Sequence, residues 1–279
     1  MSKILIFGST GFIGQNFITG SKLDNDFRLI APTRNACNLL NFTQTQNFIK
    51  KIKPGIILNL AYYGGVTSAI KYSQTNLVNN IKIATNILNS VKGNLRIKKI
   101  FFLSSSLSKE PKNTYAHIKA QTTSLSLALA KKWQLPLVIL RPYNLYGPHD
   151  RRTVVYRTIA SILKKQAFSL TAGRQKRDYL FIQDFVKILD LVVENWINFE
   201  NYETYDIGSG KAVQMKQVFS RIFKLLNFKG PYQTKDYSPD EYWYQKADTK
   251  KVKAAIGRFQ ITLLESGLKQ TISWIRESL

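Results

Sequence analysis

Short apolar runs alternate with longer amphipathic segments through the first half of the chain. The apolar runs have strand length and cover Lys3–Phe7, Phe27–Thr33, Gly55–Ala61, Lys99–Leu103 and Leu137–Arg141. The segments between them have helical patterns and cover Phe12–Gly20, Thr43–Ile52, Asn76–Val91 and Tyr115–Trp133. Strands that alternate with helices predict a parallel sheet covered on both faces. The pattern therefore predicts an α/β fold with a doubly wound parallel sheet.

The last third of the chain is less regular. It predicts a strand near Thr204–Ile207 and helices near Asp184–Trp196, Met215–Leu226, Thr249–Ile256 and Leu263–Ser278. We expect a smaller α/β lobe that closes over the carboxyl ends of the strands. The expected division assigns residues 1–165 to the sheet domain, with returning segments near 178–210, and residues 166–279 mainly to the lobe.

Composition narrows the class of protein. The chain has 279 residues, enough for a substantial core, and no apolar run long enough to span a bilayer. The N-terminal apolar run is too short for a signal-peptide core. The single cysteine, Cys37, rules out an internal disulfide framework. We therefore expect a cytoplasmic protein with a buried or spare thiol.

The formal net charge of +24 is the unusual feature. It admits nucleic acid, an anionic membrane surface or a phosphorylated small molecule as a partner. The basic residues are scattered, however, and form pairs such as Lys98-Lys99 and Arg151-Arg152 instead of a basic tail. A solvated lysine-rich surface is the simpler interpretation. Nucleic acid is an unlikely partner but stays open as an alternative.

The first strand leads directly into a glycine-rich turn with the spacing G-x-x-G-x-x-G. The turn is Gly8-Ser9-Thr10-Gly11-Phe12-Ile13-Gly14, and a predicted helix follows it. A strand, a glycine turn and a helix N-terminus form a phosphate site, because backbone N–H groups and the helix dipole point at the anion. We expect Gly8, Thr10, Gly11, Phe12, Ile13 and Gly14 to bind a dinucleotide pyrophosphate. The alternative is an ordinary glycine turn of an α/β protein.

The second predicted strand ends in Pro32-Thr33-Arg34. A carboxylate about twenty residues after the glycines usually holds the adenosine ribose and repels a 2′-phosphate. An arginine at this position can pair with the 2′-phosphate instead. Arg34 therefore favours NADP(H), with NAD(H) possible. The alternative is a surface arginine on a loop.

A catalytic pattern follows the fourth predicted strand. The strand runs into Ser104-Ser105-Ser106, and Tyr115 and Lys119 lie four residues apart on the next helix. This spacing puts the ammonium near the phenol, where, helped by an oxidised nicotinamide, it would favour the phenolate and lower the pKa of Tyr115. A serine hydroxyl can hydrogen-bond the substrate oxygen. We therefore expect catalysis by Tyr115, Lys119 and a serine. Lys119 is also expected to hold the nicotinamide ribose.

These motifs together resemble the extended short-chain dehydrogenase/reductases, the NAD-dependent nucleotide-sugar epimerase/dehydratase family. The resemblance implies a Rossmann-type fold with a smaller C-terminal substrate lobe. Counting within the family motif selects Ser106 as the catalytic serine, which would also contact substrate, with Ser105 in reserve. Asn38-Leu39 stands where the family contacts adenine, and Leu60-Ala61 ends the strand on the cofactor side.

The same resemblance supplies the expected substrate residues. Asn144 lies in the run Arg141-Pro142-Tyr143-Asn144-Leu145-Tyr146-Gly147-Pro148, and Arg177 lies in Arg177-Asp178-Tyr179. The resemblance implies that both hold the diphosphate of a nucleotide sugar. Asp184 and Asp248 are expected to cap helices. The two histidines, His117 and His149, have no metal-ligand or triad spacing, so we expect no metal site.

Further features are the chain length, the short loop between Ser106 and Tyr115, Tyr62-Tyr63-Gly64 after the third strand, and Leu170-Thr171-Ala172-Gly173 leading to Gln175-Lys176-Arg177-Asp178-Tyr179. They resemble CDP-linked 4-ketoreductases of the CDP-paratose synthase and CDP-abequose synthase type. This resemblance implies NADPH-dependent reduction of the C4 ketone of a nucleotide-linked deoxysugar, with CDP as the expected nucleotide, in polysaccharide biosynthesis. The acidic residue that the family's dehydratases carry after the serine is missing, since Leu107 and Ser108 stand there and Glu110 is displaced. An epimerase with tightly bound NAD and a nucleic-acid-binding protein on a retained fold stay as alternatives. Family analogy also suggests a homodimer.

Overall fold

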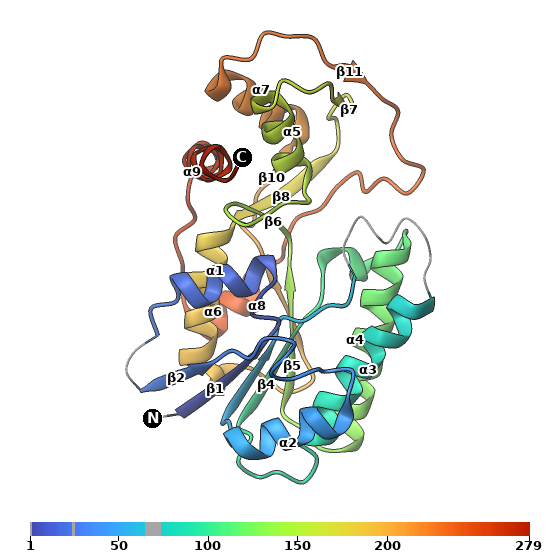
Figure 1. The fold of residues 1–279 in the computed structure, drawn as a ribbon, viewed down its shortest axis with the longest axis vertical. Helices are drawn as coiled ribbons and strands as arrows, with labels where there is room; N and C mark the ends of the chain where they lie inside the picture. Colours follow the sequence, from blue (N-terminus) through green and yellow to red (C-terminus); the bar gives the residue numbers. More distant parts are fainter. Residues whose placement is uncertain (1, 24–25, 65–73) are drawn as a thin grey trace.

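The computed structural model describes residues 2–23, 26–64 and 74–279. It has a larger lobe, built on a parallel sheet between helices, and a smaller lobe that lies at one end of it (Figure 1). The sheet has six strands in the order β2-β1-β3-β4-β5-β9, and every neighbouring pair is parallel. The strands are β1 (Ser2–Phe7), β2 (Phe27–Ile30), β3 (Ile56–Asn59), β4 (Lys99–Leu103), β5 (Leu137–Pro142) and β9 (Thr204–Ile207).

The central strands are apolar along their whole length because helices cover both faces of the sheet. In β1, Ile4 and Ile6 belong to one core cluster, while Leu5 and Phe7 belong to the other. The first cluster contains residues of α1 (Phe12–Gly20), α6 (Ile182–Glu194) and α8 (Lys250–Ile256). The second contains residues of α2 (Phe42–Ile52), α3 (Gln74–Ser90) and α4 (Thr114–Lys132). The predicted doubly wound α/β fold is confirmed.

The strand order places a switch point between β1 and β3. The chain leaves β1 toward β2 on one side, and β3 pairs with β1 on the other, with Phe7 opposite Asn59. Ligands of open α/β sheets bind in the crevice at such a point, outside the carboxyl ends of the strands. The glycine turn after β1 lies at this crevice.

The smaller lobe contains short strands and three helices. Its strands are β6 (Asn144–Tyr146), β8 (Lys176–Phe181) and β10 (Ala212–Gln214) in one sheet, and β7 (Ser169–Leu170) and β11 (Gln233–Thr234) in another. Its helices are α5 (Val154–Leu163), α7 (Met215–Leu226) and α9 (Leu264–Ser278). No single residue separates the two lobes. The helix α5, which precedes residue 165, packs against α7 and α9 of the smaller lobe. After residue 165, α6 and β9 return to the larger lobe.

Two predicted helix caps have different outcomes. Asp184 does not cap α6, because the helix begins after Phe181 and Asp184 lies within its first turn. Its carboxylate instead accepts hydrogen bonds from the backbone N–H and the hydroxyl of Thr262, at 2.7 and 2.8 Å. Asp248 does accept the N–H of Lys250 at the start of α8, at 3.1 Å. Among the described residues, no helix is long and apolar enough to cross a membrane.

Candidate active site

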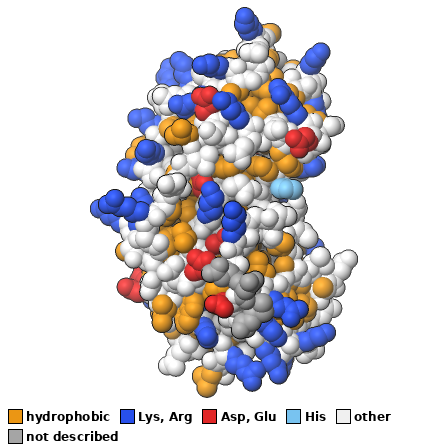
Figure 2. Space-filling model, turned by 90° about the vertical axis from the view of Figure 1, so that its left-hand side faces the viewer, with side chains coloured by type: hydrophobic (Ala, Val, Ile, Leu, Met, Phe, Trp, Pro, Cys, Tyr) orange, Lys and Arg blue, Asp and Glu red, His pale blue; other side chains and the backbone are white. Residues whose placement is uncertain are grey.

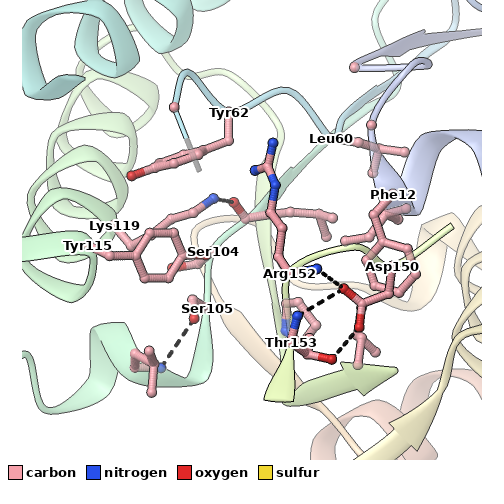
Figure 3. A pocket seen from close by; sticks show the side chains of 18 of the residues that line it. Phe12, Leu60, Tyr62, Ser104, Ser105, Tyr115, Lys119, Asp150, Arg152 and Thr153 are labelled. Carbon is pink, nitrogen blue, oxygen red and sulfur yellow. Dashed lines mark hydrogen bonds between the residues drawn. The ribbon is translucent and has the colours of Figure 1, made fainter. Parts of the chain in front are cut away.

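A cavity of about 1460 Å³ lies between the carboxyl ends of the sheet strands and the smaller lobe. Every residue predicted to bind cofactor or substrate lines it, and so does every predicted catalytic residue. Figure 3 shows part of this cavity, with Tyr115 and Lys119 on one side and Phe12 and Leu60 on the other. The roles of the individual residues stay predictions, but the fold brings all of them to one place.

The glycine turn is shaped by close backbone packing. Gly8 has a φ of 85°, and a Cβ there would lie 2.5 Å from the backbone nitrogen of Ala61. A Cβ on Gly14 would lie 2.2 Å from the carbonyl oxygen of Gly8. The N-cap of α1 is Gly11, which makes no side-chain cap hydrogen bond. The N–H groups of the first turn of α1 thus have no side-chain cap, and the turn fits a pyrophosphate group.

The adenosine end of the predicted cofactor site lies after β2. Arg34 is exposed, lines the cavity and lies 5.9 Å from the centroid of the Tyr63 ring. The side chain of Asn38 accepts the N–H of Leu40, and Leu39 is buried beside it. The preference for NADP(H) stays a prediction.

The helix α4 positions the predicted catalytic pair, Tyr115 and Lys119. Asn113 caps it by accepting the N–H of Ala116, so Tyr115 lies in its first turn and Lys119 one turn later. Lys119 is only 9% exposed, and its Nζ donates a hydrogen bond to the carbonyl oxygen of Leu103 at 3.2 Å. Burial lowers the pKa of Lys119 to about 8. The ammonium is therefore held inside the cavity wall, close to its own titration point at neutral pH.

Burial and one serine determine the acidity of Tyr115. Burial raises its pKa, and the interaction with Ser105 opposes this rise. The predicted lowering of this pKa also needs an oxidised nicotinamide, so it stays a prediction, as does the choice of Ser106 over Ser105. Ser106 begins a short 3₁₀ helix, Ser106–Lys109, and lines the same cavity. Both serines therefore remain within the candidate site.

Tyr62 packs against the predicted catalytic residues Tyr115 and Lys119 and was not itself predicted. Its ring centroid lies 4.4 Å from Lys119 Nζ and 5.3 Å from the Tyr115 ring, at an interplanar angle of 73°. Figure 3 shows the three side chains grouped on one side of the cavity. The sequence offered two signals for Tyr62, namely its position directly after Leu60-Ala61 and its place in the run Tyr62-Tyr63-Gly64, but no role was assigned to it from them.

The predicted substrate residues lie on the two adjacent strands β6 and β8. Asn144 donates to the carbonyl oxygen of Asp178 at 3.1 Å and to Gln245 at 3.4 Å. Arg177 forms an ion pair with Glu241 and donates to the carbonyl oxygen of Tyr242. Its guanidinium is thus already engaged by the segment before α8. Sequence reasoning did not anticipate this acidic partner.

A turn before α5 adds further positive charge. Asp150 is 3% exposed and accepts the N–H groups of Arg152 and Thr153, at 2.9 and 3.1 Å, together with the Thr153 hydroxyl. Burial raises the pKa of Asp150 against these hydrogen bonds. Figure 3 shows the Arg152 side chain extending from this turn into the cavity. Because Asn16 on α1 donates to Pro148 at 2.9 Å, the turn stays next to the glycine turn.

Other candidate chemistries find less support. Glu110 forms an ion pair with Lys112 and its side chain is 75% exposed, so it is not an acid of the cavity. Among the described residues, no group of three His, Cys, Asp or Glu side chains could hold a metal ion. On the face shown in Figure 2, Lys and Arg side chains are spread over both lobes with uncharged surface between them.

Comparisons with known proteins agree with this geometry. Residues 4–208 match the model of the NAD dependent epimerase/dehydratase family. GDP-L-colitose synthase of Yersinia pseudotuberculosis is 23% identical over 307 residues, covering 98% of this chain and 97% of that protein. GDP-L-fucose synthase of Escherichia coli K12 is 22% identical over 315 residues, covering 99% and 97%. The solved structure of UDP-glucose 4-epimerase from Thermotoga maritima superposes with a TM-score of 0.86 at 21% identity, covering 99% of both chains.

Proposed function

Because the chain belongs to the NAD dependent epimerase/dehydratase family, we propose that it reduces the C4 ketone of a nucleotide-linked 4-keto-6-deoxysugar with NADPH. One observation carries the proposal. The phenol of Tyr115, with Lys119 one helical turn away on α4, lines the same cavity as Ser105, Ser106 and the glycine turn. A proton donor and a dinucleotide site in one cavity are what ketone reduction requires.

Each residue of the catalytic group has a role in this reaction. NADPH, when bound, supplies the hydride that adds to C4. Tyr115 gives its phenolic proton to the C4 oxygen, so that the carbonyl becomes a hydroxyl, and then regains a proton from solvent. Ser105 or Ser106 orients the carbonyl oxygen by hydrogen bonding. Lys119 provides positive charge near the phenol and holds the nicotinamide ribose.

The first proton transfer distinguishes reduction from epimerisation. A phenol that keeps its proton at neutral pH can act as an acid directly. An epimerase must first oxidise its substrate, which needs the phenolate as a base. The epimerase alternative predicts that the purified protein already carries NAD, which release by denaturation and spectroscopy would reveal.

The basic lining of the cavity supports an anionic substrate. Arg152 extends into the cavity, and Arg177 and Asn144 line its substrate half. A nucleotide diphosphate carries the charge that such residues recognise. The likeness drawn from the sequence favours CDP, whereas the two curated relatives are named for GDP-linked sugars. The nucleotide base is therefore part of the test.

Elimination and nucleic-acid binding have less support than reduction. A 4,6-dehydratase needs an acid next to the substrate, and Glu110 pairs with Lys112 in a mostly exposed position. A nucleic-acid interface needs a continuous basic stripe or patch. The scattered charges of Figure 2 do not form one on that face. A homodimer, predicted by analogy, would be tested by light scattering.

The decisive experiment follows the absorbance of reduced nicotinamide after mixing with a ketosugar. CDP-linked and GDP-linked 4-keto-deoxysugars are each run with NADPH and with NADH. Rapid oxidation of NADPH with one nucleotide, and slow oxidation of NADH, is the expected result. NADPH binding without oxidation by any of the ketosugars would overturn the proposed reduction.

A further inference from the structure

Tyr62 occupies a position that the proposed reaction has not yet used. It follows β3 after Leu60 and Ala61, so the fold delivers its ring to the cavity wall beside α4. The ring makes two contacts with catalytic groups, one through its face and one through an edge-type packing. The face meets Lys119 Nζ at 4.4 Å, and the ring meets Tyr115 at 5.3 Å.

The surroundings of Lys119 explain why an aromatic face matters there. Its Nζ donates to one carbonyl oxygen, that of Leu103, and no carboxylate forms an ion pair with it among the residues that the structure describes. A buried ammonium without a carboxylate loses hydration and favours its neutral form. The negative face of an aromatic ring at this distance attracts the cation and opposes that loss.

We propose that Tyr62 is a positioning residue whose ring face keeps Lys119 charged and in place, and whose edge contact fixes the ring of Tyr115. The proposal rests on the proposed reduction for its catalytic meaning, but not for its physical content. Both effects come from the aromatic ring of Tyr62 and not from its hydroxyl group. Phenylalanine at position 62 should therefore preserve the effect on Lys119, whereas an aliphatic side chain of similar size should not.

The titratable and charged groups that face Lys119 are few. Tyr115 lies one turn before it on α4, and Tyr62 covers it from the end of β3. Arg152 extends into the same cavity from the turn before α5. Strand β4 offers the carbonyl of Leu103, and α3 contributes the uncharged Asn80 to a small neighbouring pocket. Changing Tyr62 thus changes the main stabilising surface of the ammonium without adding or removing a nearby charge.

The test measures the titration of Lys119 directly. Protein labelled with ¹³C at lysine Cε is followed by NMR from pH 6 to about 10, a range chosen to bracket the lysine transition, and the Lys119 signal is assigned with Lys119→Arg. The variants are Tyr62→Phe, Tyr62→Leu and a protein carrying 3,4,5-trifluorophenylalanine at position 62. The fluorinated ring keeps nearly the same shape but has a weakened negative face, so it separates packing from electrostatics.

Three results are expected. Tyr62→Phe leaves the pKa of Lys119 within about 0.3 units of the wild type, because the ring is retained. Tyr62→Leu and the fluorinated variant lower it by about one unit, since a desolvated cation–π contact is worth about 1–2 kcal/mol. Turnover of the two weakened variants then falls about threefold near pH 7.5 and recovers near pH 6, where Lys119 is charged in all of them.

Phe259→Leu is the matched control. It removes a ring that lies 5.6 Å from Lys253 Nζ, outside the cavity, and should leave the Lys119 signal unchanged. An unshifted or raised pKa in the fluorinated variant would overturn the proposal, as would a loss of turnover in Tyr62→Phe as large as in Tyr62→Leu. A wild-type protein that reduces no ketosugar would count against the proposed reduction alone, because the NMR titration needs no turnover.

Discussion

The two halves of the cavity, to which we assign the cofactor and the substrate in our proposal, offer different kinds of anion site. The cofactor half uses backbone, since the turn from Gly8 to Gly14 brings the N-terminus of α1 to the crevice with no side-chain cap. The substrate half uses side chains, and its main guanidinium, Arg177, is already paired with Glu241. A backbone site is fixed by sterics, whereas an ion-paired site can be adjusted by changing one charge. The halves should therefore respond differently to substitution.

Between the halves lie the predicted catalytic residues, which form neither a backbone site nor an ion pair with any described residue. Tyr115, Lys119 and Tyr62 form a buried aromatic cluster around one ammonium. Substitutions there should change the rate of the chemical step and leave binding in both halves nearly intact. This separation of binding from chemistry sets the order of the predictions.

The largest effect is expected for Tyr115→Phe. Removing the proton donor should lower turnover by about 10²–10⁴-fold, the usual contribution of a positioned acid. NADPH affinity, measured by fluorescence titration, should change little because the glycine turn is untouched. Tyr156→Phe makes the same chemical change outside the cavity and should keep full turnover. Wild-type turnover in Tyr115→Phe would remove the phenol from the mechanism.

A second large effect distinguishes the two serines. Ser105→Ala should lower turnover by about 10²-fold, as expected for the loss of a donor to a developing oxyanion. Ser106→Ala should cost less, because Ser105 is the serine that interacts with Tyr115. Steady-state kinetics of both variants at saturating substrate give the comparison. A larger loss in Ser106→Ala would return the role to the serine chosen from the motif.

In the proposed cofactor half, a steric clash in the glycine turn should weaken cofactor binding. In Gly14→Ala the new Cβ would lie 2.2 Å from the carbonyl oxygen of Gly8, so the turn must shift. We expect NADPH affinity to fall at least tenfold and the free energy of unfolding to fall by about 1–3 kcal/mol. Gly93→Ala meets no atom within 4 Å and should leave NADPH affinity unchanged. Equal affinities in the two variants would mean that the turn does not hold the cofactor.

In the proposed substrate half, substitutions of Glu241 and Arg177 should change the KM for the nucleotide sugar in opposite directions. Glu241→Gln removes the negative charge beside Arg177 and should lower the KM for the nucleotide sugar about fivefold, a change of about 1 kcal/mol. Arg177→Gln should raise KM by a similar factor or more. NADPH affinity should stay constant in both variants. Changes of the same sign would show that the ion pair supports the lobe and does not contact the diphosphate.

The smallest expected effect is a fall in the rate of reduction at high pH. Lys119 is charged below its pKa of about 8 and neutral above it, so the rate of reduction should fall as the pH rises through about 8. Tyr115 does not produce this fall, because its raised pKa keeps it protonated there. Lys119→Arg keeps its charge at these pH values, and its profile should be flat even though its overall rate is lower. A fall retained in that variant would belong to another group.

The larger lobe could be predicted closely because its signals are local. The run Lys99–Leu103 and the helix Phe12–Gly20 have the predicted bounds. Central parallel strands are apolar on both faces, and the glycine turn marks the start of a helix whatever the rest of the chain does. The predicted parallel α/β sheet followed from these short-range patterns.

In the smaller lobe the helices α7 and α9 were also predicted, within one residue of their bounds, but the short strands and α5 were not. Its strands β6, β8 and β10 have three to six residues, and they pair across long stretches of chain, as Asn144 does with Tyr179. The helix α5 begins with the β-branched pair Val154-Val155, a composition typical of strands. Such elements depend on tertiary pairing, which no local pattern reports.

The candidate site shows the same division. The motif located Tyr115 and Lys119, since residues four apart on a helix must share a face. It did not distinguish Ser105 from Ser106, because that choice depends on how the chain turns after β4. Nor did it find Glu241, which reaches Arg177 from 64 residues away.

A hydrogen bond between Tyr242 and Lys112 connects the segment that holds Arg177 to the start of α4. The Tyr242 hydroxyl accepts the N–H of Lys112 at 2.9 Å, directly before the residue that caps α4. The carbonyl of the same Tyr242 accepts from Arg177. We therefore expect a nucleotide that draws Arg177 away from the segment 241–242 also to perturb the start of the helix that carries Tyr115. Binding in the proposed substrate half and the position of Tyr115 would then be thermodynamically linked, and such linkage is reciprocal.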